Sequence, residues 1–98
     1  MINRIVIMKF EPSKVDEFLT VFDQSKEHIR AFPGNAGLKL IQDTNDSSIM
    51  STYSLWETEA DLEAYRHSEL FKSTWAKTKI LFRDKPVAFS NWVIRELI

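Results

Sequence analysis

Residues 53–61 read YSLWETEAD, and this stretch contains the end of a predicted strand and the beginning of a predicted helix. Thr58 and Asp61 are typical helix-capping residues, because their side-chain oxygens accept hydrogen bonds from the free N–H groups of a first helical turn. Tyr65, Phe71 and Trp75 follow and add aromatic rings. The stretch has no phosphate-binding glycine loop and no metal-ligand motif. We therefore expect any chemistry to take place against ring faces.

The chain before this stretch predicts one strand and one helix. Residues 2–10 are rich in β-branched side chains and apolar on both alternating faces, which is typical of a strand buried on both sides. Ser13 can cap a helix, with Asp16 completing a capping-box-like start. Apolar residues then recur at helical spacing until Pro33 and Gly34, which end the helix.

The rest of the chain continues the alternation of strands and helices. A strand, a turn and a returning strand form a predicted hairpin at residues 38–42, 43–47 and 49–56. Two short helices follow, one capped by Thr58 and the other by Ser68. Pro86 ends the helical region, and residues 87–98 are predicted to form a long final strand.

The order β-α-β-β-α-β predicts a single α+β domain over residues 1–98, with a ferredoxin-like antiparallel sheet and helices on one face. The strands hold more large apolar residues than two helical regions can cover. These residues are Ile5, Ile7, Leu38, Leu40, Met50, Trp56, Val93 and Leu97. Because a large exposed apolar patch usually marks an interface, we expect a homodimer. Two sheets would pack face to face in it, and the last strand would reach the partner.

The composition excludes several classes of function. The formal net charge is −1 and there is no basic run, so we expect no nucleic acid partner, because phosphate binding requires clustered Lys and Arg. Cysteine is absent, which excludes disulfides, thiol catalysis and thiolate metal sites. The apolar run at residues 5–8 is too short for a membrane span or a signal sequence. We therefore expect no membrane association and a cytoplasmic location.

An acidic cluster marks the start of the first short helix. It consists of Glu57, Glu59, Asp61 and Glu63. Carboxylates at this position interact favourably with the helix dipole. No histidine lies at ligand spacing among them, so the cluster predicts a solvated helix start and no metal site.

The strand end YSLWE at residues 53–57, the acidic helix start, His67-Ser68 and Phe71 together resemble the antibiotic biosynthesis monooxygenase family. Further matches are Pro33-Gly34, Gly37 and Pro86. The resemblance covers nearly the whole chain and implies the dimeric α+β-barrel fold of that superfamily. Its members include cofactor-independent monooxygenases of polyketide quinones, haem-degrading monooxygenases, autoinducer-processing proteins and many proteins of unknown role.

In the quinone monooxygenases an Asn, a Trp and a Tyr line the substrate pocket. The resemblance aligns Trp56 with the Trp, Thr52 with the Asn and Leu62 with the Tyr. Thr52 can still hydrogen-bond a substrate oxygen, although it lacks the paired donor and acceptor of an amide. This branch of the family implies a planar substrate stacked on Trp56.

In the haem-degrading branch an Asn contacts the oxygen side, a Trp packs under the haem and a His ligates the iron. Asn3 matches the Asn, Tyr65 stands at the Trp position and Trp75 stands at the His position. An indole offers an N–H donor and no lone pair for iron. His67, earlier on the same stretch, is the nearest substitute ligand. We therefore expect no cofactor, with haem as the alternative.

The expected site has catalytic and substrate-binding members. The catalytic candidates are Trp56, Asn3 and Thr52, and the substrate-binding candidates are Tyr65, Phe71, Trp75, His67 and Asn91. Each has a structural alternative. The rings can be core or interface residues, and His67 and His28 can be surface residues. The two asparagines can be buried polar groups paired at the domain edge or at the dimer seam.

We expect a cofactor-independent monooxygenase that acts on a planar aromatic or phenolic small molecule with O₂. A deprotonated substrate of this kind can itself pass an electron to O₂, so the protein need only bind it, shape the site and exclude water. Two alternatives stay open. One is a non-catalytic small-molecule-binding or regulatory dimer, and the other is a haem-binding or haem-degrading protein without the usual His ligand.

Overall fold

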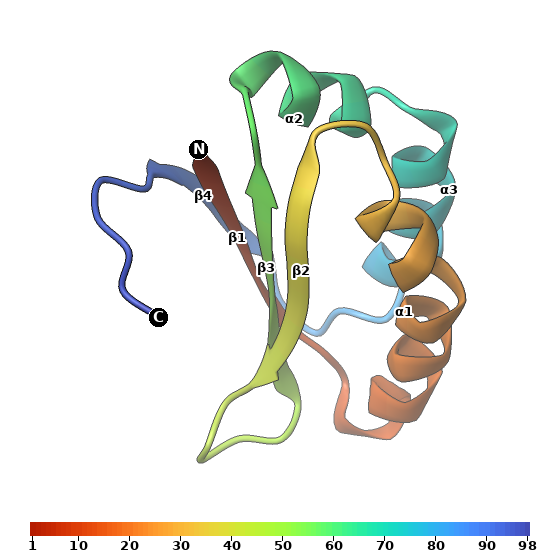
Figure 1. Ribbon diagram of the computed structural model, residues 1–98. Coiled ribbons are helices and arrows are strands. Elements are labelled where there is room, and N and C mark those ends of the chain that lie inside the picture. The colour runs from red at the N-terminus through yellow and green to blue at the C-terminus, as the bar shows by residue number, and fades with distance from the viewer.

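The computed structural model describes residues 1–98 as one antiparallel sheet with helices on one of its faces (Figure 1). The elements in chain order are β1 (Ile2–Lys9), a 3-10 turn (Pro12–Lys14), α1 (Val15–Arg30), β2 (Asn35–Gln42), β3 (Ile49–Trp56), α2 (Glu59–Arg66), α3 (Glu69–Lys79) and β4 (Val87–Trp92). The strand order in the sheet is β2-β3-β1-β4. The predicted ferredoxin-like α+β fold is confirmed. None of the helices has the length and apolarity that crossing a bilayer requires.

The register of the sheet decides which side chains face the helices. β1 pairs with β3 so that Met8 lies opposite Met50 and Ile2 opposite Trp56. Alternate residues of a strand point to opposite faces, and Met8 and Met50 pack against Phe18 of α1. The even-numbered residues of β1 and β3 therefore face the helices, and the odd-numbered ones line the open face.

The core has two parts. The larger cluster consists of Met8, Phe10, Phe18, Met50 and Leu81. The rings of Phe10 and Phe18 stack with centroids 4.2 Å apart. The smaller cluster, Ile2, Trp56 and Leu62, joins the end of the sheet to α2. A space remains between these clusters, and the candidate site lies there.

Two predicted helix starts are confirmed. The Thr58 hydroxyl accepts a hydrogen bond from the Asp61 N–H (3.1 Å) at the start of α2. The Ser68 hydroxyl accepts one from the Phe71 N–H (3.1 Å) at the start of α3. Each cap satisfies a backbone donor that has no partner within the helix.

The predicted cap at Ser13 is wrong. Lys14 N–H donates to the Glu11 carbonyl (2.8 Å) and closes a 3-10 turn that includes Pro12. The α-helix begins only at Val15, and no side chain caps it. The tight turn after Pro12 takes Ser13 out of the capping position.

The predicted strand over residues 87–98 is too long. β4 ends at Trp92, which lies opposite Ile2. Because β1 begins at Ile2, residues beyond Val93 find no neighbouring strand with which to exchange backbone hydrogen bonds. Residues 93–98 instead leave the sheet on the side away from the helices (Figure 1).

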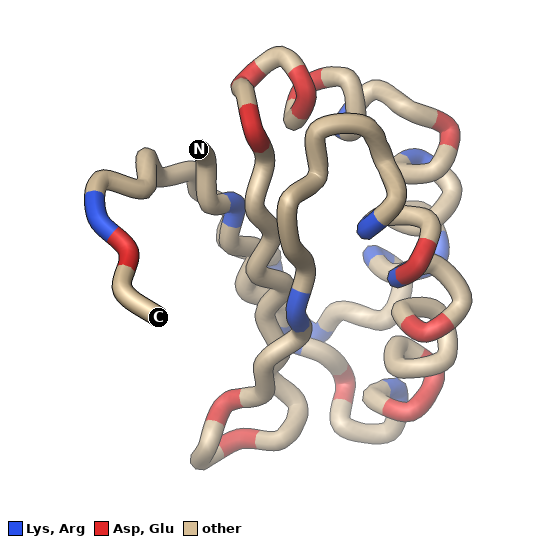
Figure 2. Tube along the Cα trace, viewed as in Figure 1, with Lys and Arg blue, Asp and Glu red and all other residues tan.

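The prediction of which apolar strand residues the helices leave uncovered is only partly right. Four residues from the expected uncovered set face the helices: Leu38, Leu40, Met50 and Trp56. The open face is still apolar, because Ile41, Val87 and Phe89 are exposed there by 47%, 51% and 41%. Figure 2 shows that both acidic and basic residues occur along the helices, and that acidic residues follow one another around α2.

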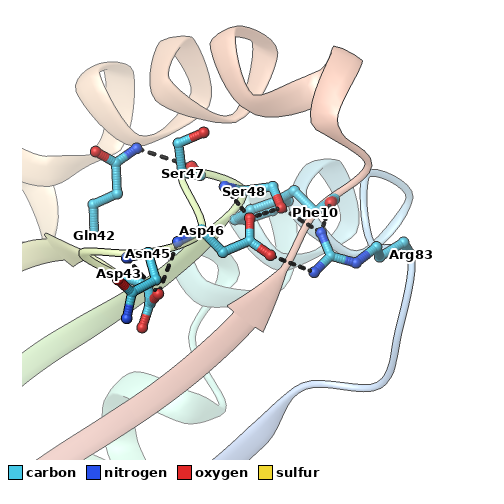
Figure 3. Close-up of polar contacts among 8 residues, drawn as sticks. All are labelled: Phe10, Gln42, Asp43, Asn45, Asp46, Ser47, Ser48 and Arg83. Atoms are coloured by element: carbon cyan, nitrogen blue, oxygen red, sulfur yellow. Dashed lines mark hydrogen bonds and ion pairs between the residues drawn. The ribbon is translucent and has the colours of Figure 1, made fainter.

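Arg83 ties three separate segments together (Figure 3). Its guanidinium donates to the Phe10 carbonyl (2.7 Å) and to the Ser48 hydroxyl, and it forms an ion pair with Asp46 (3.2 Å). Asp46 also accepts from the Ser48 N–H (2.9 Å). The β2–β3 loop is therefore held against the chain that follows α3.

Gly34 allows a sharp turn between α1 and β2. Its φ is +87°, a conformation that is costly for any residue with a Cβ. A Cβ at this position would also overlap the Asp61 side chain. The Gly34 carbonyl accepts from the Glu57 N–H (2.9 Å), so the turn holds the start of α2 in place.

Candidate functional site

A cavity of about 340 Å³ lies between the sheet and the helices. Side chains from β1, β2, β3, β4 and all three α-helices line it, and they are mostly apolar. Its volume falls within the range of about 300–1,000 Å³ that is usual for small-molecule sites. Such a cavity can hold a small planar ligand away from water.

Three aromatic rings on α2 and α3 form a continuous wall of the cavity. The Tyr65 ring meets the Phe71 ring edge to face at 5.4 Å, and Phe71 stacks on Trp75 at 5.8 Å with an interplanar angle of 11°. All three residues line the cavity. The helix break at Ser68 makes this possible, because the Ser68 hydroxyl donates to the Tyr65 carbonyl (2.6 Å) while it caps α3.

Trp56 lies behind this wall and does not line the cavity. Its ring has 0% exposure and stacks on Tyr65 with centroids 4.8 Å apart. Its indole N–H donates to the Ser54 hydroxyl (3.0 Å). The expected stacking of a substrate on Trp56 is therefore corrected, because Tyr65 occupies the position between Trp56 and the cavity.

The sheet contributes polar groups to the cavity floor. Thr52 and Ser54 of β3 line it together with Arg4 of β1, which lies opposite Ser54. The Ser54 hydroxyl already accepts the hydrogen bond from the Trp56 indole N–H. The Thr52 hydroxyl is one group on the floor that can hydrogen-bond a ligand oxygen.

Tyr65 is a partly buried tyrosine in the lining of the cavity. Burial raises the pKa of Tyr65 to about 12. The hydroxyl therefore keeps its proton well into the alkaline range. A protonated phenol can donate a hydrogen bond to an oxygen acceptor.

Arg4 and Arg66 also line the cavity, and sequence reasoning did not single them out. One signal was available for Arg4. It occurs in β1 on the same alternating face as Ile2, Val6 and Met8, and a charged residue on a buried apolar face is uncommon without a partner. No comparable sequence signal marks Arg66 within α2.

Asn3, Asn91 and His67 lie outside the cavity. Asn3 and Asn91 are opposite each other in the β1–β4 pair and belong to the open face of the sheet. The Oδ1 atom of Asn3 is buried without a hydrogen-bond partner. The His67 side chain is 77% exposed, and its Nδ1 atom lies 2.8 Å from the Glu63 carbonyl. The structure thus brings Thr52, Tyr65, Phe71 and Trp75 together around the cavity. The three other candidates lie outside it.

The residues of the cavity do not fit the usual haem site. No histidine lines it, and the raised pKa of Tyr65 disfavours a phenolate ligand for iron. The chain also has no group of three or more side chains that could hold a metal ion.

Similarity to a known protein family covers most of the chain. The sequence model of the antibiotic biosynthesis monooxygenase family matches residues 1–77. No match to a curated protein was found. Many solved structures share the fold.

Three of these structures illustrate the similarity. A conserved protein from Methanosarcina mazei has 18% identity and a TM-score of 0.88, with 92% of this chain and 89% of that chain covered. An antibiotic biosynthesis monooxygenase has 18% identity and a TM-score of 0.90, with 97% and 100% covered. A variant of SnoaB, a cofactor-independent oxygenase from Streptomyces nogalater, has 11% identity and a TM-score of 0.87, with 98% and 95% covered.

At identities this low, the similar structures show only that the fold is shared. Membership of the family is shown by the match to its sequence model. The matched residues include β1, α1, the β2–β3 hairpin, α2 and most of α3, and these elements build most of the cavity. The chain belongs to the antibiotic biosynthesis monooxygenase family.

Proposed function

We propose that the protein is a cofactor-independent monooxygenase that binds a planar, electron-rich phenolic substrate in this cavity and allows it to react with O₂. The observation that carries the proposal is the ring wall of Tyr65, Phe71 and Trp75 facing a floor that holds Thr52. Flat rings gain contact area and favourable ring–ring geometry against such a wall.

The lining of the cavity constrains the chemistry. It contains no carboxylate and no histidine, so no conventional general base faces a bound substrate. The substrate must therefore ionise easily by itself, as an anthrone does. Its anion passes one electron to O₂, and the resulting radicals combine into a hydroperoxide at the ring carbon. Loss of water converts that carbon to a carbonyl, so one oxygen atom enters the product and the other leaves as water.

Two hydroxyl groups serve this chemistry in the proposal. The Tyr65 phenol donates a hydrogen bond to the anionic oxygen of the substrate, and Thr52 holds a second substrate oxygen. A hydrogen bond to a charged oxygen is stronger than one to a neutral oxygen. Both groups therefore favour the reactive anion over the neutral substrate.

Turnover of dithranol, an anthrone, tests the proposal. We expect oxygen consumption and formation of the quinone above the rate in buffer, and a lower rate for Tyr65→Phe and Thr52→Val. Tyr53→Phe serves as a matched control, since Tyr53 lies on the open face of the sheet. Tight binding of dithranol without turnover above buffer would refute the enzyme proposal.

That last outcome would support the second candidate, a non-catalytic small-molecule-binding module. Two observations favour it. The cavity lacks a general base, and Asn3, one of the catalytic candidates, belongs to the other face of the sheet.

We also propose that two copies of the chain pack through their open sheet faces. The exposed apolar residues Ile41, Val87 and Phe89 support this arrangement. Light scattering should report a dimer for the wild type and a monomer for Phe89→Glu. Ile80→Glu is the control, because Ile80 follows α3 on the helix layer and is 73% exposed. A wild-type monomer, or a dimer retained by Phe89→Glu, would contradict the proposed interface.

A further inference from the structure

Two arginines are part of the lining of the cavity. Arg4 belongs to β1, the strand between β3 and β4, and Arg66 belongs to the last turn of α2. The rest of the lining is mainly apolar and has no carboxylate. A guanidinium in such surroundings gives up hydration, and this is costly unless a partner replaces the water.

Arg4 has no charged partner within the chain. Its guanidinium donates a hydrogen bond to the Ser90 hydroxyl (3.1 Å) and forms no ion pair. A guanidinium has five N–H donors, so most of its capacity is unused. The side chain is also partly buried, which makes the lack of an anionic partner more costly than it would be on the surface.

Arg66 is only partly neutralised. It forms an ion pair with Glu63 (2.7 Å) in the same turn of α2. Glu63 is not part of the lining of this cavity. Together with Arg66 and Ser90 it lines a neighbouring hollow. Burial, and then the positive charge of Arg66, lower the pKa of Arg4, while Glu63 raises it. The two arginines thus repel each other, and Glu63 offsets only part of this repulsion.

We propose that this cavity binds planar aromatic carboxylates, with the carboxylate between Arg4 and Arg66 and the ring along Tyr65 and Phe71. The inference rests on the proposed function, because it names the substrate class of the same site. A guanidinium matches the two oxygens of a carboxylate with parallel hydrogen bonds. The charges of Arg4, Arg66 and Glu63 sum to about +1. One carboxylate neutralises this charge, whereas a doubly charged phosphate would exceed it.

Calorimetric titration with three probes of similar shape tests the inference. These are 2-naphthoate, its neutral amide and 2-naphthyl phosphate. For the wild type we expect naphthoate to bind at least about tenfold more tightly than the amide. Arg4→Gln should reduce this preference to within about twofold. Arg95→Gln removes the same charge outside the cavity, and it should keep the wild-type preference.

Two further variants keep the inference testable if Arg4→Gln does not fold by circular dichroism. Arg4→Lys keeps the charge without the planar fork, so its preference for naphthoate should lie between those of the wild type and the amide-like limit. Arg66→Gln alters a partly exposed helix residue, and it should weaken naphthoate binding while it leaves amide binding unchanged.

Three outcomes would overturn the inference: equal affinities for naphthoate and its amide, tighter binding of naphthyl phosphate, or no binding of any probe. Dithranol turnover separates this inference from the proposed function. Turnover without a preference for naphthoate would overturn the carboxylate inference alone. A preference for naphthoate that depends on Arg4, together with dithranol that binds tightly but is not turned over, would support the inference and overturn the monooxygenase proposal.

Discussion

We expect the free energy of unfolding to fall steeply in alkali because of one phenol, that of Tyr65. Burial raises the pKa of Tyr65 to about 12 from the ordinary 10.0. An unfolded chain exposes this phenol and loses its proton near the ordinary value, whereas the folded protein retains the proton. Because the unfolded state then binds fewer protons, stability falls as pH rises. At about 1.36 kcal/mol for each pKa unit, the loss is about 2.7 kcal/mol, absent below about pH 10 and complete at about pH 12.

Urea unfolding between pH 8 and pH 12 measures this loss. Lysines and other groups titrate in the same range, so the informative quantity is the difference in unfolding free energy between the wild type and Tyr65→Phe. This difference should fall by about 2.7 kcal/mol across the alkaline range. Tyr53→Phe removes the other tyrosine hydroxyl of the chain, and it should retain the steep loss that Tyr65 causes. Parallel stability curves for the wild type and Tyr65→Phe would refute the reasoning.

Two further predictions concern the turns that hold the site together. Gly34→Ala should lower the unfolding free energy by at least about 1–2 kcal/mol because of the positive φ of Gly34. Gly37→Ala should lower it less in the same urea experiment, because the added Cβ would make only an ordinary contact at 3.4 Å. Equal effects of the two substitutions would contradict this account. The hydrogen bonds from Ser48 lower the pKa of Asp46, so Asp46 stabilises the fold at neutral pH and this contribution is lost as pH falls below its ordinary value of 3.8. Asp46→Asn should therefore be less stable than the wild type at pH 7, and the two should converge in acid; a constant difference would exclude the mechanism.

Local sequence signals predicted the elements well where one signal was sufficient. Ile49–Trp56 is a strand with the predicted bounds, and Thr58 and Ser68 cap the helices as expected. Each of these features depends on residues that are close in sequence. The end of β4 could not be predicted in this way, because it depends on where β1 begins to offer a partner.

The candidate site was predicted in part. Tyr65, Phe71 and Trp75 were substrate-binding candidates, and the structure brings them together around the cavity. Trp56 carries the clearest family signal but is covered by Tyr65. The covering of one ring by another and the presence of Arg4 and Arg66 in one cavity lining are not encoded in local spacing, because both depend on how α2 packs on the sheet.

The sequence by itself determined the order of the elements, the family and the aromatic character of the site. Periodicity, capping residues and the strand end at residues 53–57 act over short distances and can be read along the chain. Only the tertiary structure decided which face of the sheet each residue serves. A strand exposes alternate side chains to opposite faces, so the packing of the helices on one face decides that Thr52 and Arg4 line the cavity and that Asn3 does not.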